Sequence, residues 1–262
     1  MTGRLTLLDP DTGIRIASIQ AHQKYAVRVL YSSPYAISAA YDKTICLHKI
    51  VYSADDGEPA FSEEIGKLCL PTLPEALALV TLPGNGKKAI VFSRRDSTML
   101  YYHLLCDSLS FHSERDLAPG SSSWVSYHPM SISVHPKEPT LLAVATSSVP
   151  HMKFILVEID SENVVKELFT GAPQSEYSTA VLGWRPDASG VWLNADEGVV
   201  RGLEVKSGKV VVRLNACEGG EKVRTLWAGD VAGLGEVLIT GGFDKALRIW
   251  TIGNHQAIEA SV

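Results

Sequence analysis

The chain has 262 residues, of which 45% are hydrophobic and 20% are charged, so its composition excludes a disordered chain. The 24 Lys and Arg residues against 29 Asp and Glu residues give a formal net charge of -5 without basic blocks. This balance argues against general binding to nucleic acid or to an anionic membrane, so we expect neither as a partner.

Taken in chain order, short segments with alternating apolar residues are separated by turn residues, a pattern typical of β-strands. Residues 4–8 and 14–20 are predicted as two strands around the turn Asp11-Thr12-Gly13. From residue 21 onward, groups of about four such strands follow one another. No long stretch carries the helical period, so the sequence predicts an all-β protein with few helices.

Internal repeats organise these strands. Residues 36–48 and 238–250 both contain small residues, an aromatic residue, Asp-Lys and then an alternating apolar strand, at the same offsets. The segments before them also match, and the copies recur at roughly 48 to 54 residues, slightly more than the usual WD repeat of about 40–45. Weaker copies lie at 91–101, at 193–204 and, as strand pattern alone, at 141–159.

At these residues the chain resembles a WD-repeat β-propeller. That resemblance implies blades of four antiparallel strands, in which a His before the first strand bonds an Asp in the turn between the second and third strands. A Ser or Thr and a Trp complete this network in the family. The matching residues are His22, Ser38 and Asp42 in the first full copy, where His48 occupies the Trp position.

The last copy matches the same network at Thr240, Asp244 and Trp250, but Cys217 stands where the His is expected. The copies near Asp96 and Asp196 keep an acid and lose the other members. Because a carboxylate in a tight turn near a buried sheet needs hydrogen-bond donors, we interpret this turn network as structural and not catalytic.

Strand counting predicts one propeller domain over residues 1–262 with five complete blades and a partial N-terminal one. The expected ranges are 1–20 for the partial blade and about 21–70, 71–118, 124–171, 177–215 and 216–262 for the complete ones. We interpret the chain as a shortened relative of a seven-bladed propeller, missing about a blade and a half upstream. Such an open arc would expose blade edges through which chains can associate.

Other motifs favour structural over chemical roles. Residues 84–88, Gly-Asn-Gly-Lys-Lys, lack the spacing of a phosphate-binding loop and are expected to form a hairpin turn. His128 and His135, each followed by Pro, are expected in loops and rigid turns and not on a metal. The four cysteines form no Cys-x-x-Cys pair and no zinc-ligand group with the histidines, so we expect no metal and no cofactor.

The same cysteine usage indicates a reducing, intracellular location, cytoplasmic or nuclear. The N-terminus shows no signal-peptide pattern, and no apolar run approaches the roughly 20 residues that span a bilayer.

Candidate partner-binding residues come from propeller geometry. The loops before each first strand and the turns that carry the Asp open on one face of a propeller, and aromatic and Arg residues are the usual anchors of protein contacts. The residues that we place on this face are Lys24, Tyr25, Tyr41, Arg95, Trp184, Arg185, Trp227 and Phe243. For the two tryptophans Trp184 and Trp227, packing between blades is the competing interpretation.

The resemblance and the absence of a catalytic constellation predict a non-enzymatic scaffold that binds proteins through the channel-face loops. One alternative is a substrate-receptor subunit of a ubiquitin ligase, but the Trp-Asp-x-Arg motif that such subunits often carry is missing after Trp250 and after His48. The other alternative is an enzyme with its site in the channel mouth, which needs convergent acids, histidines or a metal on the inner loops.

Overall fold

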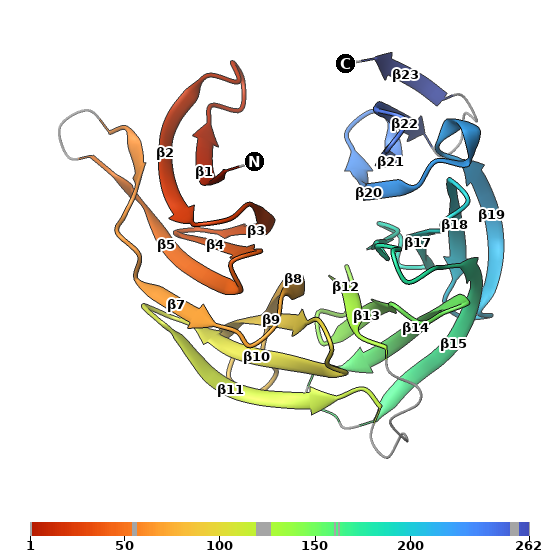
Figure 1. Cartoon of the computed structure of the whole chain (residues 1–262), viewed down its shortest axis with the longest axis horizontal. Coiled ribbons are helices and arrows are strands. Elements are labelled where there is room, and N and C mark those ends of the chain that lie inside the picture. The colour runs from red at the N-terminus through yellow and green to blue at the C-terminus, as the bar shows by residue number, and fades with distance from the viewer. Residues whose placement is uncertain are drawn as a thin grey trace. The chain divides into compact units, whose positions relative to one another are not determined.

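The structure is a computed structural model that describes residues 2–53, 57–118, 127–159, 161, 163–251 and, for the backbone, 257–261. The chain divides into two compact units, Met1–Pro119 and Gly120–Val262, each described by itself below (Figure 1). The single propeller domain over residues 1–262 and its blade ranges stay a prediction.

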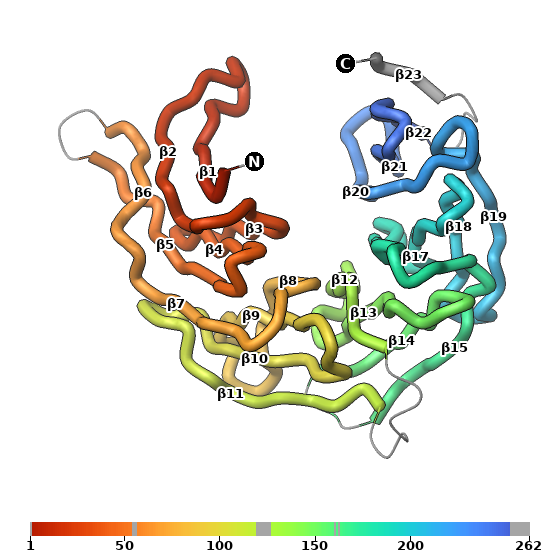
Figure 2. The backbone as a smooth tube through the Cα atoms, viewed as in Figure 1, coloured from red at the N-terminus to blue at the C-terminus, as the bar shows by residue number. Residues whose placement is uncertain are grey.

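The first unit contains three antiparallel sheets in its described residues, and Figure 2 traces the chain through them. A two-stranded sheet comes first, with β1 (Gly3–Leu8) and β2 (Arg15–His22). The second sheet is made of β3 (Ala26–Ser32), β4 (Tyr35–Ala40), β5 (Thr44–Tyr52), β6 (Pro59–Phe61) and β7 (Gly66–Cys69). The third sheet is made of β8 (Pro74–Thr81), β9 (Lys88–Arg94), β10 (Met99–Leu105) and β11 (Leu109–Asp116).

The second sheet of this unit has its outer position divided between two short strands. β6 pairs with β5 at Ile50–Tyr52, and β7 pairs with the same edge of β5 at Thr44–Leu47. The sheet therefore has four strand positions, as the neighbouring sheet β8–β11 has.

The second unit contains three four-stranded antiparallel sheets in its described residues. They are made of β12 (Pro129–Val134), β13 (Leu141–Thr146), β14 (His151–Glu158) and β15 (Val164–Pro173); of β16 (Leu182–Trp184), β17 (Gly190–Asn194), β18 (Val199–Glu204) and β19 (Lys209–Asn215); and of β20 (Val223–Val231), β21 (Gly235–Gly242), β22 (Ala246–Thr251) and β23 (Ala257–Ser261). A 3-10 helix, Glu218–Gly220, precedes β20.

Burial along each strand follows its position in the sheet. Every residue of β17 is buried, because a middle strand of a stacked sheet is covered on both faces. The outer strand β19 alternates between half-buried and exposed residues, because one of its faces meets solvent. Alternating apolar and polar residues in the sequence therefore indicate outer strands, and continuous apolar runs indicate middle strands.

Sheets pack face to face within each unit. In the first unit, Ile37 and Leu47 of the β3–β7 sheet pack with Ile90 and Phe92 of the β8–β11 sheet. In the second unit, one cluster joins β12–β15 to β16–β19, and another joins β16–β19 to β20–β23. These apolar layers supply the main stabilising free energy of the sheets.

Trp192 shows how two sheets of the second unit are fitted together. Its side chain is 2% exposed and lies against Gly202, where a Cβ atom would come within 3.2 Å of the indole ring. The indole N–H donates to Glu236 at the start of β21 at 2.9 Å, and Arg185 donates to the same carboxylate at 2.6 Å. Apolar and polar contacts therefore hold the same sheet interface.

The glycine-rich segment after β8 is a hairpin turn, as the sequence predicts. Gly84 and Gly86 have φ values of 77° and 65°, the left-handed region that favours glycine. The N–H of Leu82 donates to the carbonyl of Lys87 at 2.8 Å, which closes the turn between β8 and β9. Because β9 follows at once, the helix that a phosphate-binding loop needs is missing at this position.

Candidate interaction surface

We call the loop end of a sheet the end where the chain enters the first strand and where a turn joins the second strand to the third. At the loop end of the β3–β7 sheet, the ring of buried His22 lies 2.7 Å from Ser38 Oγ and 2.8 Å from Thr44 Oγ1. Asp42 Oδ2 lies 3.3 Å from His22 Nδ1 and accepts the N–H of Gln23 at 2.8 Å. The side chains of His22, Ser38 and Asp42 thus lie together as the sequence predicts.

The Trp position of this network holds His48, whose buried ring turns to other partners. Its Nδ1 lies 3.3 Å from the carbonyl oxygen of Ser62, and its ring meets that of Phe61 edge-on, with centroids 6.3 Å apart. His48 therefore anchors the segment between β6 and β7 to β5.

Burial lowers the pKa of His22, and the nearby Asp42 carboxylate raises it by less. Burial raises the pKa of Asp42, but hydrogen bonds from Thr44 and Gln23 outweigh this and hold it below its usual value. The network is therefore a neutral imidazole beside a carboxylate at neutral pH, which suits a structural tie.

His22 makes folding stability depend on pH in a defined window. Because its pKa is lower in the folded chain than the usual value of about 6.5, its contribution is complete above pH 6.5 and is lost as the pH falls below that value. We expect the free energy of unfolding to decrease from pH 7.5 to pH 5.5 in the wild type, and to decrease less in His22→Gln. Urea denaturation at the two pH values measures both decreases. The limiting slope is about 1.4 kcal/mol per pH unit for one group.

His112→Gln, which changes an exposed histidine of the same unit, is the matched control. A His22→Gln chain with the same pH dependence as the wild type would contradict a buried, neutral His22. Protonation of Asp42 does not interfere, because its window lies below about pH 4.

At the loop end of the last sheet, β20–β23, the turn acid has a different partner. Trp250 donates its indole N–H to Thr240 Oγ1 at 3.1 Å, in keeping with the predicted network. Cys217 is buried at the expected His position, and burial raises the pKa of its thiol to about 11. Asp244 instead accepts from the buried guanidinium of Arg248 at 2.5 Å, and Arg248 also donates to the carbonyl of Ala216 at 3.1 Å. Arg248 therefore replaces the missing His.

In the β16–β19 sheet, an Arg again pairs with the turn acid in place of the expected His. Gly198 has a φ of 74° and takes the left-handed turn position that Lys43 and Lys245 take in the first and last matching copies. The acid before it is Glu197, which pairs with the buried Arg201 four residues later, as Asp244 pairs with Arg248. The sequence alignment that put Asp196 at the turn is therefore shifted by one residue.

Asp196 has a separate role. It accepts from Ser175 Oγ at 2.7 Å and from Ser178 Oγ at 2.5 Å, and it pairs with Lys222 Nζ at 2.9 Å. The carboxylate thereby ties the loop before β16 to the segment before β20.

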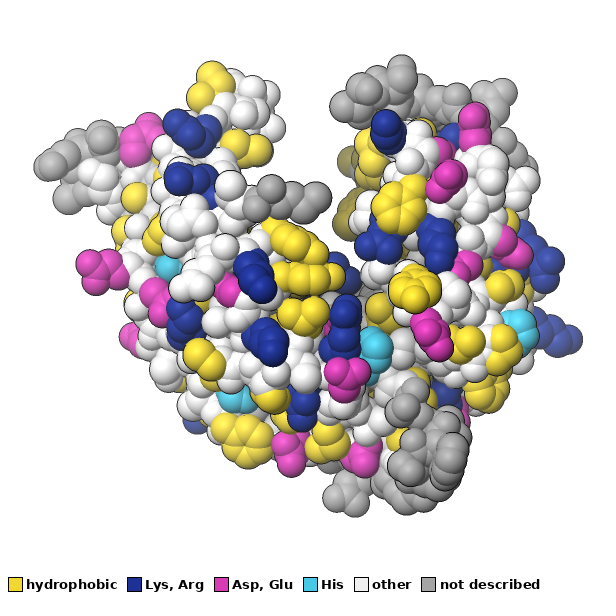
Figure 3. Space-filling view, in the orientation of Figure 1, with side chains coloured by type: hydrophobic (Ala, Val, Ile, Leu, Met, Phe, Trp, Pro, Cys, Tyr) yellow, Lys and Arg dark blue, Asp and Glu magenta, His cyan; other side chains and the backbone are white. Residues whose placement is uncertain are grey.

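Four of the predicted partner-binding residues lie at the loop ends of the two full sheets of the first unit. Tyr25 and Tyr41 stack with ring centroids 4.2 Å apart, and Lys24 beside them is exposed. Arg95 follows β9 and pairs with Glu75 at 2.6 Å. On the surface of this unit, Figure 3 shows Lys and Arg side chains lying beside hydrophobic ones.

In the second unit, Phe243 alone among the predicted partner residues lies at a loop end. Its ring is 55% exposed, and the guanidinium of Arg224 lies 5.0 Å from the ring centroid. Arg224 was not among the residues predicted from the sequence, although its position at the start of β20 could have indicated it. The pair again combines an aromatic ring with a cation.

The predicted placement of Trp184 and Arg185 is wrong. Trp184 is the last residue of β16 and Arg185 follows it, so both lie at the end of the sheet away from its loop end. Trp184 is buried and donates its indole N–H to the carbonyl of Ser133 at 3.1 Å, and Arg185 is engaged with Glu236. A short first strand of three residues places both side chains at its far end.

Trp227 also lies away from the loop end. It sits in the middle of β20 opposite Ile239 and is 50% exposed on the face of that sheet. Its ring covers Gly229, two residues along the same strand. The residue remains accessible, but not as part of the loop surface.

The histidines that precede prolines have structural partners. His135 Nδ1 accepts the N–H of Lys137 at 3.2 Å and of Glu138 at 2.8 Å, which fixes a tight turn after β12. His128 Nδ1 lies 3.1 Å from Ser147 Oγ. Within the described residues, no group of three or more His, Cys, Asp or Glu side chains is arranged to hold a metal ion.

In the part of the chain that the structure describes, five antiparallel sheets have four strand positions each and are connected outer strand to first strand, which defines a β-propeller. The family model described as "UCP007778, beta-propeller domain" matches residues 1–251, and the chain therefore belongs to this β-propeller family.

Among solved structures, the chain is similar to the Dos1 propeller, with a TM-score of 0.64 and 10% sequence identity. This match covers 98% of the present chain and 64% of the other, so the chain spans less than two thirds of that propeller's length. No match was found among curated protein sequences. No helix in the described part of the chain has the length and apolar character needed to cross a membrane.

Proposed function

We propose that this chain is a divergent WD-repeat propeller that acts as a non-enzymatic scaffold and binds partner proteins through the loop ends of its sheets. The observation that carries this proposal is the Tyr25–Tyr41 stack with exposed Lys24 beside it, and Arg95 at the loop end of the next sheet. Rigid aromatic side chains next to cations are typical anchors of protein interfaces.

The WD-repeat assignment is supported by the contacts of His22 with Ser38 and Asp42, and by that of Trp250 with Thr240. Residues of a WD network recur in two sheets that are far apart in the sequence. β-Propellers are often used for protein interaction, and this common use of the fold supports the scaffold role.

A non-enzymatic role is supported by the use of the loop-end acids. Asp42 and Asp244 are engaged with His22 and Arg248, so they are not poised for acid or base chemistry. We also propose an intracellular location, because all four cysteines are free thiols and two of them are buried. The net charge of -5 favours proteins over nucleic acid or anionic lipid as partners.

The test is affinity capture with quantitative protein detection on three chains. The wild type is compared with Tyr25→Ser/Tyr41→Ser and with Tyr52→Ser, whose residue is 69% exposed at the far end of β5 in the same sheet. We expect the proteins enriched by the wild type to fall at least tenfold with the double variant and to be kept by Tyr52→Ser.

Thermal melts of the same samples verify that the double variant is folded. The proposal is overturned if no protein is enriched over a tag-only control, or if the enriched proteins depend on Tyr52 and not on the tyrosine pair. If the double variant loses both its partners and its folded state, the stack has a structural role in that variant. Lys24→Glu, which changes an exposed residue, then decides whether this loop end also binds partners.

A further inference from the structure

The two-stranded sheet of the first unit leaves one edge of β1 open. In the part of the chain that the structure describes, β1 pairs with β2 alone, from Gly3 to Leu8. An open edge presents backbone N–H and C=O groups at the spacing of a β-ladder, and an extended chain satisfies them.

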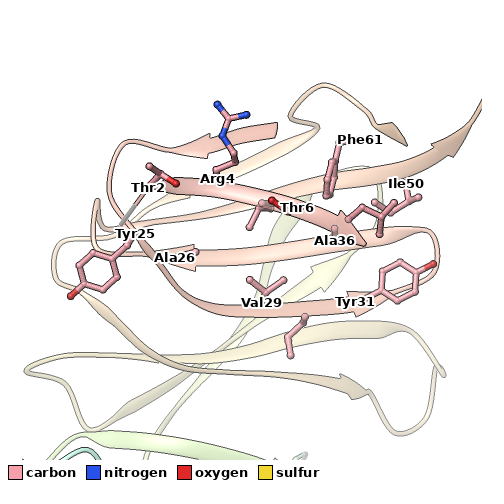
Figure 4. A pocket seen from close by; sticks show the side chains of 13 residues that line it. Thr2, Arg4, Thr6, Tyr25, Ala26, Val29, Tyr31, Ala36, Ile50 and Phe61 are labelled. Atoms are coloured by element: carbon pink, nitrogen blue, oxygen red, sulfur yellow. The ribbon is translucent and has the colours of Figure 1, made fainter. Parts of the chain in front are cut away.

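A pocket of about 580 Å³ adjoins this edge (Figure 4). It is bordered by β1 on one side and by β3, β4, β5 and β6 on the other, so it lies between the two-stranded sheet and the sheet that follows it. Leu5, Leu7, Val29, Tyr31 and Phe61 line it together with a single charged residue, Arg4.

The lining is apolar and unusually accessible for the first strand of a sheet. Val29 and Tyr31 on β3 are 57% and 60% exposed, whereas Leu77 and Leu79 on the corresponding strand β8 are buried or half-buried. The difference arises because β8 is packed against the β3–β7 sheet, while β3 has only the narrow β1–β2 ribbon beside it. Covering the two exposed side chains would remove apolar surface from water.

Strand order indicates what kind of segment fits beside β1. In the sheets that follow, an outer strand leads directly to the first strand of the next sheet, as β7 leads to β8. β2 leads to β3 in the same way, so β2 and β1 correspond to the fourth and third strands of a sheet. The pocket then occupies the place of its first and second strands, which is the space of a β-hairpin.

We propose that this pocket binds an apolar β-hairpin of a partner protein, which pairs with the open edge of β1, covers Val29 and Tyr31, and places an acidic residue near Arg4. The surface is a sheet edge that shares only Tyr25 with the loop-end residues Lys24, Tyr25, Tyr41 and Arg95, so the inference goes beyond the scaffold role proposed above. β-Strand addition of this kind takes its affinity from main-chain hydrogen bonds and its specificity from alternate side chains.

A second copy of the chain is a poorer occupant. Its own β1–β2 ribbon is already packed against β5 and β6, and Leu5 is 5% exposed there. That ribbon would have to leave its own sheet before it could enter the pocket of a neighbour.

The test uses a synthetic peptide with the sequence of residues 74–94, the hairpin of β8 and β9, which is apolar and carries Glu75. We expect saturable binding to the full chain and at least tenfold slower amide hydrogen exchange in residues 3–8 when the peptide is bound. The outer strand β11, which also has an edge, should show no change. A scrambled peptide should neither bind nor protect.

Two substitutions at matched exposure locate the site. Tyr31→Asp, in the pocket, should weaken peptide binding at least tenfold, whereas Phe111→Asp, equally 60% exposed on β11, should leave it unchanged. Both residues are at the surface, so both variants are expected to fold. Equal affinity of the two variants, or no protection of residues 3–8 at saturating peptide, overturns the proposal.

Sedimentation of the full chain tests whether a second copy of the chain, and not a partner hairpin, fills the pocket. A dimer that the peptide dissociates would show that a second copy fills the pocket, and the partner-hairpin proposal would then be wrong. Tyr25 of the tyrosine pair borders the pocket, but Tyr31→Asp leaves the pair unchanged and Lys24→Glu leaves the pocket lining unchanged. Failure of the hairpin site and failure of the loop-end site can therefore be told apart with these two variants.

Discussion

Replacing Asp244 with Ala should lower the free energy of unfolding by about 3–5 kcal/mol, because it leaves the guanidinium of Arg248 buried without its carboxylate partner. The side chains of Arg248 and Asp244 are 6% and 10% exposed, and their nearest atoms lie 2.5 Å apart. Urea denaturation followed by tryptophan fluorescence measures the change. If Asp244→Ala does not fold, soluble yield and the double variant below still report on the pair.

The control for this prediction is Glu218→Gln. Glu218 is a second carboxylate near Arg248, at 3.7 Å, but its side chain is 82% exposed, so its removal should cost less than about 1 kcal/mol. Asp244→Ala/Arg248→Met removes the buried charge as well and should recover much of the lost stability. A double variant that is no more stable than Asp244→Ala would show that the pair does not act as proposed.

Replacing Trp192 with Ala should lower the free energy of unfolding by about 3–5 kcal/mol, the usual cost of removing a large buried aromatic side chain. The indole fills the space over Gly202 and donates its N–H to Glu236 on the next sheet. The substitution therefore opens a cavity and leaves Arg185 to donate to the half-buried carboxylate of Glu236 without the indole.

Trp227→Ala is the matched control, since that indole is 50% exposed on β20. We expect a loss below about 1 kcal/mol, typical of a surface substitution. Because the chain keeps other tryptophans in both variants, the same fluorescence measurement serves for each. Similar losses in the two variants would contradict the view that Trp192 holds the interface between β16–β19 and β20–β23.

Local sequence patterns predicted much of the strand structure correctly. The Pro-Gly-Asn-Gly turn after β8 and the Asp-Lys turns after β4 and β21 depend on residues that are close in the chain. The contact between His22 and Ser38 could also be predicted, because the resemblance to a WD-repeat propeller implies it. The order of strands then follows from short antiparallel connections.

Other features could not be predicted from the sequence, for physical reasons. Trp184 was placed at the loop end because an aromatic residue near a strand boundary can lie at either end, and only the three-residue length of β16 decides between them. The sequence favours Asp196 over Glu197 as the turn acid because Asp is the more common acid in such turns, but the left-handed Gly198 places Glu197 there.

The sequence by itself determined an all-β chain, its repeated four-strand units and the turns that separate them, because alternation and turn chemistry act over a few residues. The tertiary structure decided which side chain meets each turn acid, His22 for Asp42 but Arg248 for Asp244. It also decided that Val29 and Tyr31 line a pocket beside the open edge of β1. These features depend on strand register and on the packing of one sheet against another, which residues distant in the chain set together.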